Sequence, residues 1–168
     1  MKRRKSGIFG YRKSNAVIDT IFAFIIMFIL ALVSLIAWNT WNELKVDVRA
    51  DISPDGQAVI DEVDGQGASL LDGAFVFVFI GLWIFVIVAS LMIDAHPFFF
   101  ILALILLIFA FIGFAMFGNF YEEFFSDAEY IDISADFPAT NFIMLHILQI
   151  GIAIGVSVGI SLYAKSRL

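Results

Sequence analysis

The sequence contains no cysteine and little charge, and both absences narrow what the protein can be. Without cysteine there are no disulfides, no thiol nucleophile and no thiolate ligand for a metal. Charged residues make up 15% of the 168 residues and hydrophobic residues 61%, against about 25% and about 45–50% in soluble domains. A domain of about this length leaves roughly a third of its unfolded surface exposed, so it could not hide this much apolar surface from water. A soluble monomer is therefore excluded.

Catalytic motifs are lacking as well, and so are charged groups in the middle of the apolar runs. No nucleophile-elbow, zinc-protease, phosphate-loop or dinucleotide-binding pattern occurs in a suitable context. A proton-coupled transporter would need a carboxylate near the middle of a span, and none is present. The two histidines, His96 and His146, fall at opposite ends of predicted spans, too far apart to hold one haem. We expect no enzyme activity, no cofactor and no metal.

Four apolar segments are each long enough to cross a membrane. They cover residues 17–38, 73–93, 98–117 and 142–164. A hydrocarbon core about 30 Å thick requires about 20 such residues, and in lipid each segment must satisfy its backbone hydrogen bonds internally, as a helix. The first run is too long for a cleaved signal peptide, and no small-residue cleavage site follows it. The sequence predicts an all-α polytopic membrane protein with four transmembrane helices.

Basic residues are concentrated at the two ends of the chain. The N-terminal tail, residues 1–16, and the C-terminus, residues 165–168, together hold eight of the ten. These eight are Lys2, Arg3, Arg4, Lys5, Arg12, Lys13, Lys165 and Arg167. Because positive charge marks the cytoplasmic side, both termini are expected there, an N-in and C-in topology. The tail is suited to contact anionic lipid, an acidic protein surface or nucleic acid.

Acidic residues gather in the two segments on the other side, residues 39–72 and 118–141. These hold fourteen acidic and two basic residues, a net charge of −12, whereas the cytoplasmic parts sum to +7. In the first segment, Ser53-Pro54 signals the start of a short helix, and Gly65-Gln66-Gly67 indicates a flexible joint after it. The second segment mixes aromatic and acidic residues, which is typical of a loop lying on a membrane surface. A docking surface for a partner protein is the alternative.

Only residues 94–97 separate the second and third spans. Such a short connection predicts a tight antiparallel hairpin, with Pro97 in the first turn of the next helix. Asp94 and His96 would cap the helix ends, or else belong to a metal or partner site.

The fourth span carries the clearest packing pattern. Gly151, Gly155 and Gly159 recur every four residues, as in a glycine zipper that lets another helix approach closely. Roughly on the opposite side, His146 and Gln149 are expected to make interhelical hydrogen bonds. The glycines would pack against the chain's own spans or, alternatively, join copies in a homo-oligomer.

The layout resembles that of small integral membrane proteins of tailless icosahedral viruses with an internal membrane, of the tectivirus and corticovirus kind. The resemblance rests on the Lys2-Arg3-Arg4-Lys5 start, the adjacent hydrophobic spans and the lack of catalytic motifs. It implies a viral structural protein that lines the virion membrane and links the bilayer to the surrounding capsid shell. Two alternatives are an accessory subunit of a cellular membrane complex and a holin-like protein that permeabilises the host cytoplasmic membrane.

Overall fold

The computed structural model describes residues 16–92, 97–127 and 130–165, and every element in these ranges is a helix. The elements are α1 (Ala16–Asp51), α2 (Pro54–Met92), α3 (Pro97–Phe125), α4 (Ile131–Ala135), α5 (Pro138–Leu145) and α6 (Ile147–Lys165). The expected all-α fold is therefore confirmed. The basic tail, residues 94–96 of the turn and residues 166–168 lie outside the described residues.

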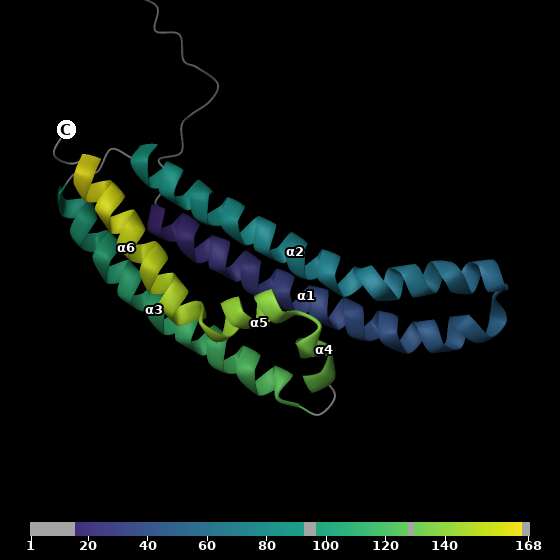
Figure 1. Cartoon of the computed structure of the whole chain (residues 1–168). Coiled ribbons are helices and arrows are strands. Elements are labelled where there is room, and N and C mark those ends of the chain that lie inside the picture. Colours follow the sequence, from purple (N-terminus) through teal and green to yellow (C-terminus); the bar gives the residue numbers. More distant parts are fainter. Residues whose placement is uncertain (1–15, 93–96, 128–129, 166–168) are drawn as a thin grey trace, which may run out of the picture.

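The helices form a bundle at one end of the molecule and a two-helix hairpin at the other (Figure 1). In the bundle, α1 packs against α2 and α3, and α6 packs against α2 and α3. Helices α1 and α2 then continue past the bundle as the hairpin, whereas α4 and α5 lie where the hairpin leaves the bundle (Figure 1). The two short helices therefore close one end of the bundle.

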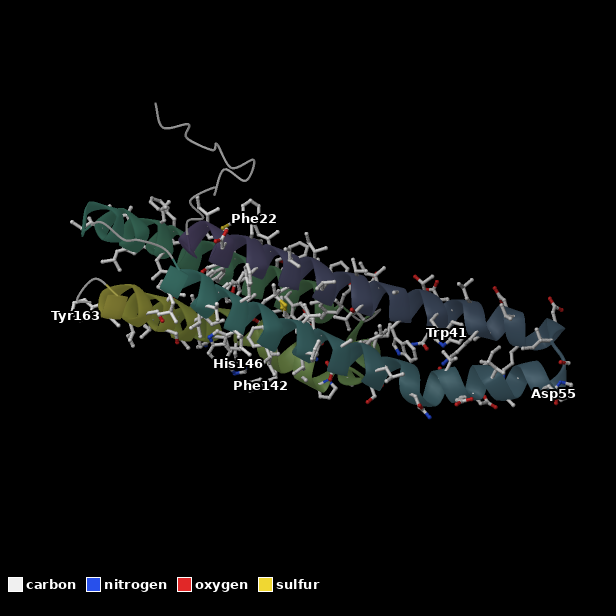
Figure 2. All side chains as sticks on the ribbon, turned by 90° about the horizontal axis from the view of Figure 1, so that it is seen from above. Phe22, Trp41, Asp55, Phe142, His146 and Tyr163 are labelled. Carbon is white, nitrogen blue, oxygen red and sulfur yellow. The ribbon has the colours of Figure 1, made fainter. Side chains whose placement is uncertain are left out.

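Helix α1 has one side buried in the bundle and an opposite side that is exposed and apolar. Its buried residues include Phe24, whose ring centroid lies 4.0 Å from that of Phe114 on α3. One turn on, the rings of Phe28 and Phe117 stack at 4.7 Å. The opposite side of α1 exposes bulky apolar residues such as Phe22, which Figure 2 shows at the edge of the molecule. Three helices are long and apolar enough to cross a membrane, or four if α5 and α6 count as one bent span.

The first acidic segment is more regular than the sequence predicts. Helix α1 continues through it to Asp51, and α2 begins at Pro54, so a two-residue turn replaces most of the expected loop. Ser53 caps α2 as expected, since its hydroxyl accepts the Gly56 N–H at 3.4 Å and its carbonyl accepts the Gln57 N–H at 3.0 Å. The flexible joint expected at residues 65–67 is wrong, because α2 runs through these residues without a break.

Gly67 explains this difference. The ring of Trp38 on α1 packs directly on it, and a Cβ added to Gly67 would lie 2.5 Å from the Trp38 Cζ3 atom. Real side chains do not tolerate such a distance, so only glycine lets the indole ring sit between the two helices. Gly67, which predicts a flexible joint in the sequence, therefore allows a close contact between α1 and α2 in the structure.

The fourth predicted span, residues 142–164, is not one straight helix. Helix α5 ends at Leu145 and α6 begins at Ile147, and the two are bent by 71°. At His146 the backbone leaves the helical region, with φ −109° and ψ 19°. The carbonyl of Phe142 accepts the His146 N–H at 3.2 Å, which ends α5 before the chain turns.

The three glycines of α6 have different surroundings. A Cβ on Gly151 would lie 2.4 Å from the Phe114 ring, and one on Gly155 would lie 3.0 Å from Leu107, so both face side chains of α3. An added Cβ on Gly159 would meet nothing within 4 Å among the described residues. Gly151 and Gly155 therefore make room for bulky side chains of α3 in the same chain.

This packing predicts different outcomes for two leucine substitutions on α6. Gly151→Leu must displace the buried Phe114 ring, and overpacking of this kind costs about 1–3 kcal/mol. Gly159→Leu, the matched control, meets no side chain among the described residues at its Cβ and should change stability little. We expect a lower thermal midpoint in mild detergent for Gly151→Leu alone; equal midpoints would contradict the packing.

Candidate functional site: the polar closure and the acidic hairpin

At the end of the bundle where the hairpin begins, α4 and α5 form what we call the closure. A carboxylate of α2 caps the N-terminus of α5 there. Asp72 on α2 is buried, 7% exposed, and faces the N-terminus of α5. Its Oδ2 accepts the Ala139 N–H at 3.0 Å, and its Oδ1 accepts the Thr140 N–H at 2.7 Å and the Thr140 hydroxyl at 2.6 Å. Three donors therefore surround one buried carboxylate.

The sequence around α5 explains why the cap comes from elsewhere. The N-cap residue is Phe137, whose side chain cannot accept a hydrogen bond, and Pro138 occupies the first turn. The free N–H groups at a helix N-terminus must be satisfied when buried, and the positive end of the helix dipole favours a carboxylate. Asp72 lies 67 residues before Ala139, yet it accepts these N–H groups and places a negative charge at the helix N-terminus. Local sequence patterns do not reveal this role.

Trp38 ties the turn before α5 to the hairpin. Its indole Nε1 donates to the Asp136 carboxylate at 3.2 Å, and its ring meets the buried Phe137 ring edge-on at 6.5 Å. The same ring packs on Gly67 of α2. Trp38 thus joins α1, α2 and the α4–α5 turn, a role beyond the membrane-interface marker that tryptophan usually provides.

The second acidic segment forms helices whose aromatic side chains contribute to the core. Tyr121 is fully buried, and its hydroxyl donates to the Asn141 side-chain oxygen at 2.8 Å. The Asn141 amide then donates to the Ser134 carbonyl at 2.9 Å, which links α3, α4 and α5. Phe125 and Phe137 are also buried. These rings pack inward because α4 and α5 place their apolar faces against α1 and α3.

The hairpin beyond this closure exposes acidic side chains. Residues 39–71 hold seven acidic and two basic residues, a net charge of −5. Both basic residues form ion pairs inside the hairpin, Lys45 with Asp64 and Arg49 with Asp61. Five other acidic residues are exposed: Glu43, Asp47, Asp51, Asp55 and Glu62. Figure 2 shows Asp55 at the tip of the hairpin, so the arm is negative to its end.

A polar cleft lies at the base of the hairpin. Trp38, Asn42, Lys45, Asp64, Ser69 and Asp136 contribute to its lining. Its cation, Lys45, is already paired with Asp64. In the described part of the chain, no three His, Cys, Asp or Glu side chains are grouped so that they could hold a metal ion.

The other residues singled out in the sequence lie apart from the closure. His146 is exposed, its ring stacks on Phe142 at 4.6 Å, and its Nδ1 lies 2.8 Å from the Phe142 carbonyl oxygen. Gln149 is exposed as well. Figure 2 shows Phe142 and His146 together at the edge of the molecule. Neither His146 nor Gln149 is buried against another helix in the described part of the chain.

No family model, no curated protein and no solved structure matches the chain.

Removal of the Asp72 carboxylate should release α5. In Asp72→Ala, two backbone N–H groups and one hydroxyl lose their acceptor, at a cost of about 1–3 kcal/mol. We expect hydrogen exchange at the Ala139 and Thr140 amides to accelerate about ten- to a hundredfold. Asp47→Ala, which removes an exposed carboxylate from the hairpin, is the control and should leave these amides unchanged. Equal exchange rates in both variants would show that the cap does not hold α5.

Proposed function

We propose that the protein is a non-enzymatic structural or assembly component of a membrane-bound particle, in which the acidic hairpin is the docking arm. The observation that carries this proposal is the charge arrangement of the hairpin. Both of its cations are paired internally, and unpaired exposed acidic residues continue to its tip. Exposed charges that are mostly of one sign steer and orient a partner of opposite charge. The expected partner is therefore a basic protein surface.

The proposed topology has four spans with both termini on the cytoplasmic side. Helix α6, with 19 residues, is about 28 Å long and nearly matches a hydrocarbon core of about 30 Å. Helix α5 then lies at the outer surface as part of the closure. Residues 39–51 of α1 and residues 54–72 of α2 raise the tip of the hairpin about 20–28 Å above the hydrocarbon core at 1.5 Å per residue. This is a suitable distance for contact with a neighbouring protein layer.

In the form that the virus resemblance favours, the membrane is the internal membrane of a virion whose vesicle buds outward. Outward budding turns the non-cytoplasmic hairpin toward the capsid shell, so the partner belongs to that shell. The two faces of the protein then have separate roles. The basic tail suits anionic lipid, an acidic protein or nucleic acid on one side, and the acidic hairpin suits a basic protein on the other. A cellular complex with a constant subunit ratio is the alternative that co-purification would reveal.

Neutralisation of the hairpin tests the docking role. The triple variant Asp47→Asn, Asp51→Asn, Glu62→Gln removes three exposed carboxylates without touching the ion pairs or the closure. We expect the tagged protein, extracted gently from its native membrane, to retain its partner about tenfold less well at low salt. Retention of the wild type should also fall as salt rises.

The matched control neutralises three exposed acids of the other outer segment, Glu122, Glu123 and Asp132. The docking proposal requires this control to retain the partner like the wild type. An equal loss in both triple variants, or no loss in either, would remove the hairpin as the docking arm. A capsid protein in the retained fraction supports the virion form, and an enzyme complex in constant ratio supports the cellular one.

The absence of cysteine allows the topology to be tested with single cysteines. Asp55→Cys places a thiol at the hairpin tip, and Ser166→Cys places one at the C-terminus. In intact cells or spheroplasts, a membrane-impermeant maleimide should label the first thiol directly and the second only after permeabilisation. The reverse pattern, or immediate labelling of both, would contradict the N-in and C-in topology.

A further inference from the structure

A line of exposed positions runs along α2 at alternating spacings of four and three residues. Its members lie on one side of the helix and, apart from the half-buried Ile87, are exposed. They are Val59, Val63, Gln66, Leu70, Gly73, Phe77, Ile80, Ile84, Ile87 and Leu91. Leu70 is 67% exposed and Phe77 is 79% exposed. We call these ten positions the α2 stripe.

The α2 stripe faces away from the rest of the chain. The buried positions of α2 include Phe75 and Phe79, each two residues from Phe77. Two residues correspond to about 200° around a helix, so the stripe lies roughly opposite the packed face. Figure 1 agrees, since α2 forms one outer side of the molecule along its whole length.

Lipid cannot cover all of this surface. The predicted span begins at Gly73, whereas Val59 lies 14 residues earlier and therefore about 21 Å outside the hydrocarbon core. Val59, Val63 and Leu70 are exposed apolar side chains in the water-facing part of the hairpin. Removal of such side chains from water is favourable, so this part of the stripe favours a protein partner.

We propose that the α2 stripe binds the same stripe of a second copy, in a parallel dimer about a two-fold axis along the membrane normal. Two copies inserted in the same way present every stripe residue at the same depth, which a two-fold interface requires. A mean repeat of 3.5 residues is the spacing of a left-handed coiled coil. The stripe keeps this spacing from the hairpin through the predicted span.

The centre of the stripe is complementary to itself. Phe77 lies between Gly73 and Gly81, and a Cβ added to either glycine would meet nothing within 4 Å among the described residues. Helical side chains lean toward the preceding turn, so the Phe77 ring of each copy would lean over Gly73 of the other. Gln66 is the polar position in the water-facing half, and one such residue fixes the register of paired helices.

The area is sufficient for a specific dimer. From Val59 to Leu91 the stripe is about 48 Å long at 1.5 Å per residue, and a helix face is about 10 Å wide. Two copies would therefore cover about 1,000 Å² together, near the lower limit for specific protein interfaces. No stripe position is charged, although the neighbouring acids of two hairpins repel each other. Salt screens that repulsion, so the dimer should strengthen with salt while docking to a basic partner weakens.

Single cysteines in the cysteine-free chain test the dimer directly. Val63→Cys and Leu70→Cys place thiols in the stripe. Val46→Cys is the matched control: this valine is 66% exposed on α1, and its neighbour Lys45 pairs with Asp64, so it lies at the same height. In vesicles holding only the purified chain, we expect at least about fivefold more disulfide-linked dimer from the two stripe variants than from the control. Equal or greater cross-linking through Val46 would overturn the proposal.

A second measurement separates self-association from binding to a different protein. Light scattering in mild detergent should give a dimer for the purified wild type and a monomer for Leu70→Glu, with unchanged helix content by circular dichroism. A monomeric wild type whose stripe cysteines cross-link only to another protein in native membranes would also overturn it. The outcome does not depend on the docking arm, because the hairpin triple variant keeps the whole stripe and should remain dimeric.

Discussion

The contact between the Asp72 carboxylate and the N-terminus of α5 is the interaction on which the rest of the architecture depends. It holds α5 against α2, and α5 in turn sets where the chain bends at His146 before α6 enters the bundle. A buried carboxylate is stable only with enough donors around it, and a buried helix N-terminus only with an acceptor. The carboxylate accepts the hydrogen bonds that the α5 N-terminus must donate, and these donors stabilise the buried carboxylate. This mutual contact fixes the position of α5 in the closure.

The position of an acidic residue decides its role in this protein. Asp72 is buried and structural, and Asp61 and Asp64 join the two helices of the hairpin through Arg49 and Lys45. The remaining acids of the hairpin face water and define its surface. The net charge of −12 in the two outer segments therefore comes from acidic residues with different physical roles: buried, ion-paired or exposed. Only the exposed group is free to act on a partner, and this distinction supports the docking proposal.

Glycine shows where local patterns mislead. Gly67 predicts a flexible joint, yet it lies inside α2 and makes room for the Trp38 ring. The spacing of Gly151 predicts a close approach of another helix backbone, whereas in the structure the Phe114 ring of α3 packs on Gly151. The spacing of glycines identifies where space is needed. It does not identify what fills that space, because the partner side chain comes from a different part of the chain.

The sequence by itself determines that the chain is helical and that several of its helices suit a membrane. It also separates basic residues at both ends of the chain from acidic residues in two internal segments, because these properties follow from composition and local order. It also predicts the cap at Ser53, a contact between near neighbours. The tertiary structure alone decides the Asp72 cap, the bend between α5 and α6, and the inward packing of Tyr121 and Phe137. These features join residues that are distant in the chain, and helical periodicity carries no information about which distant groups will meet.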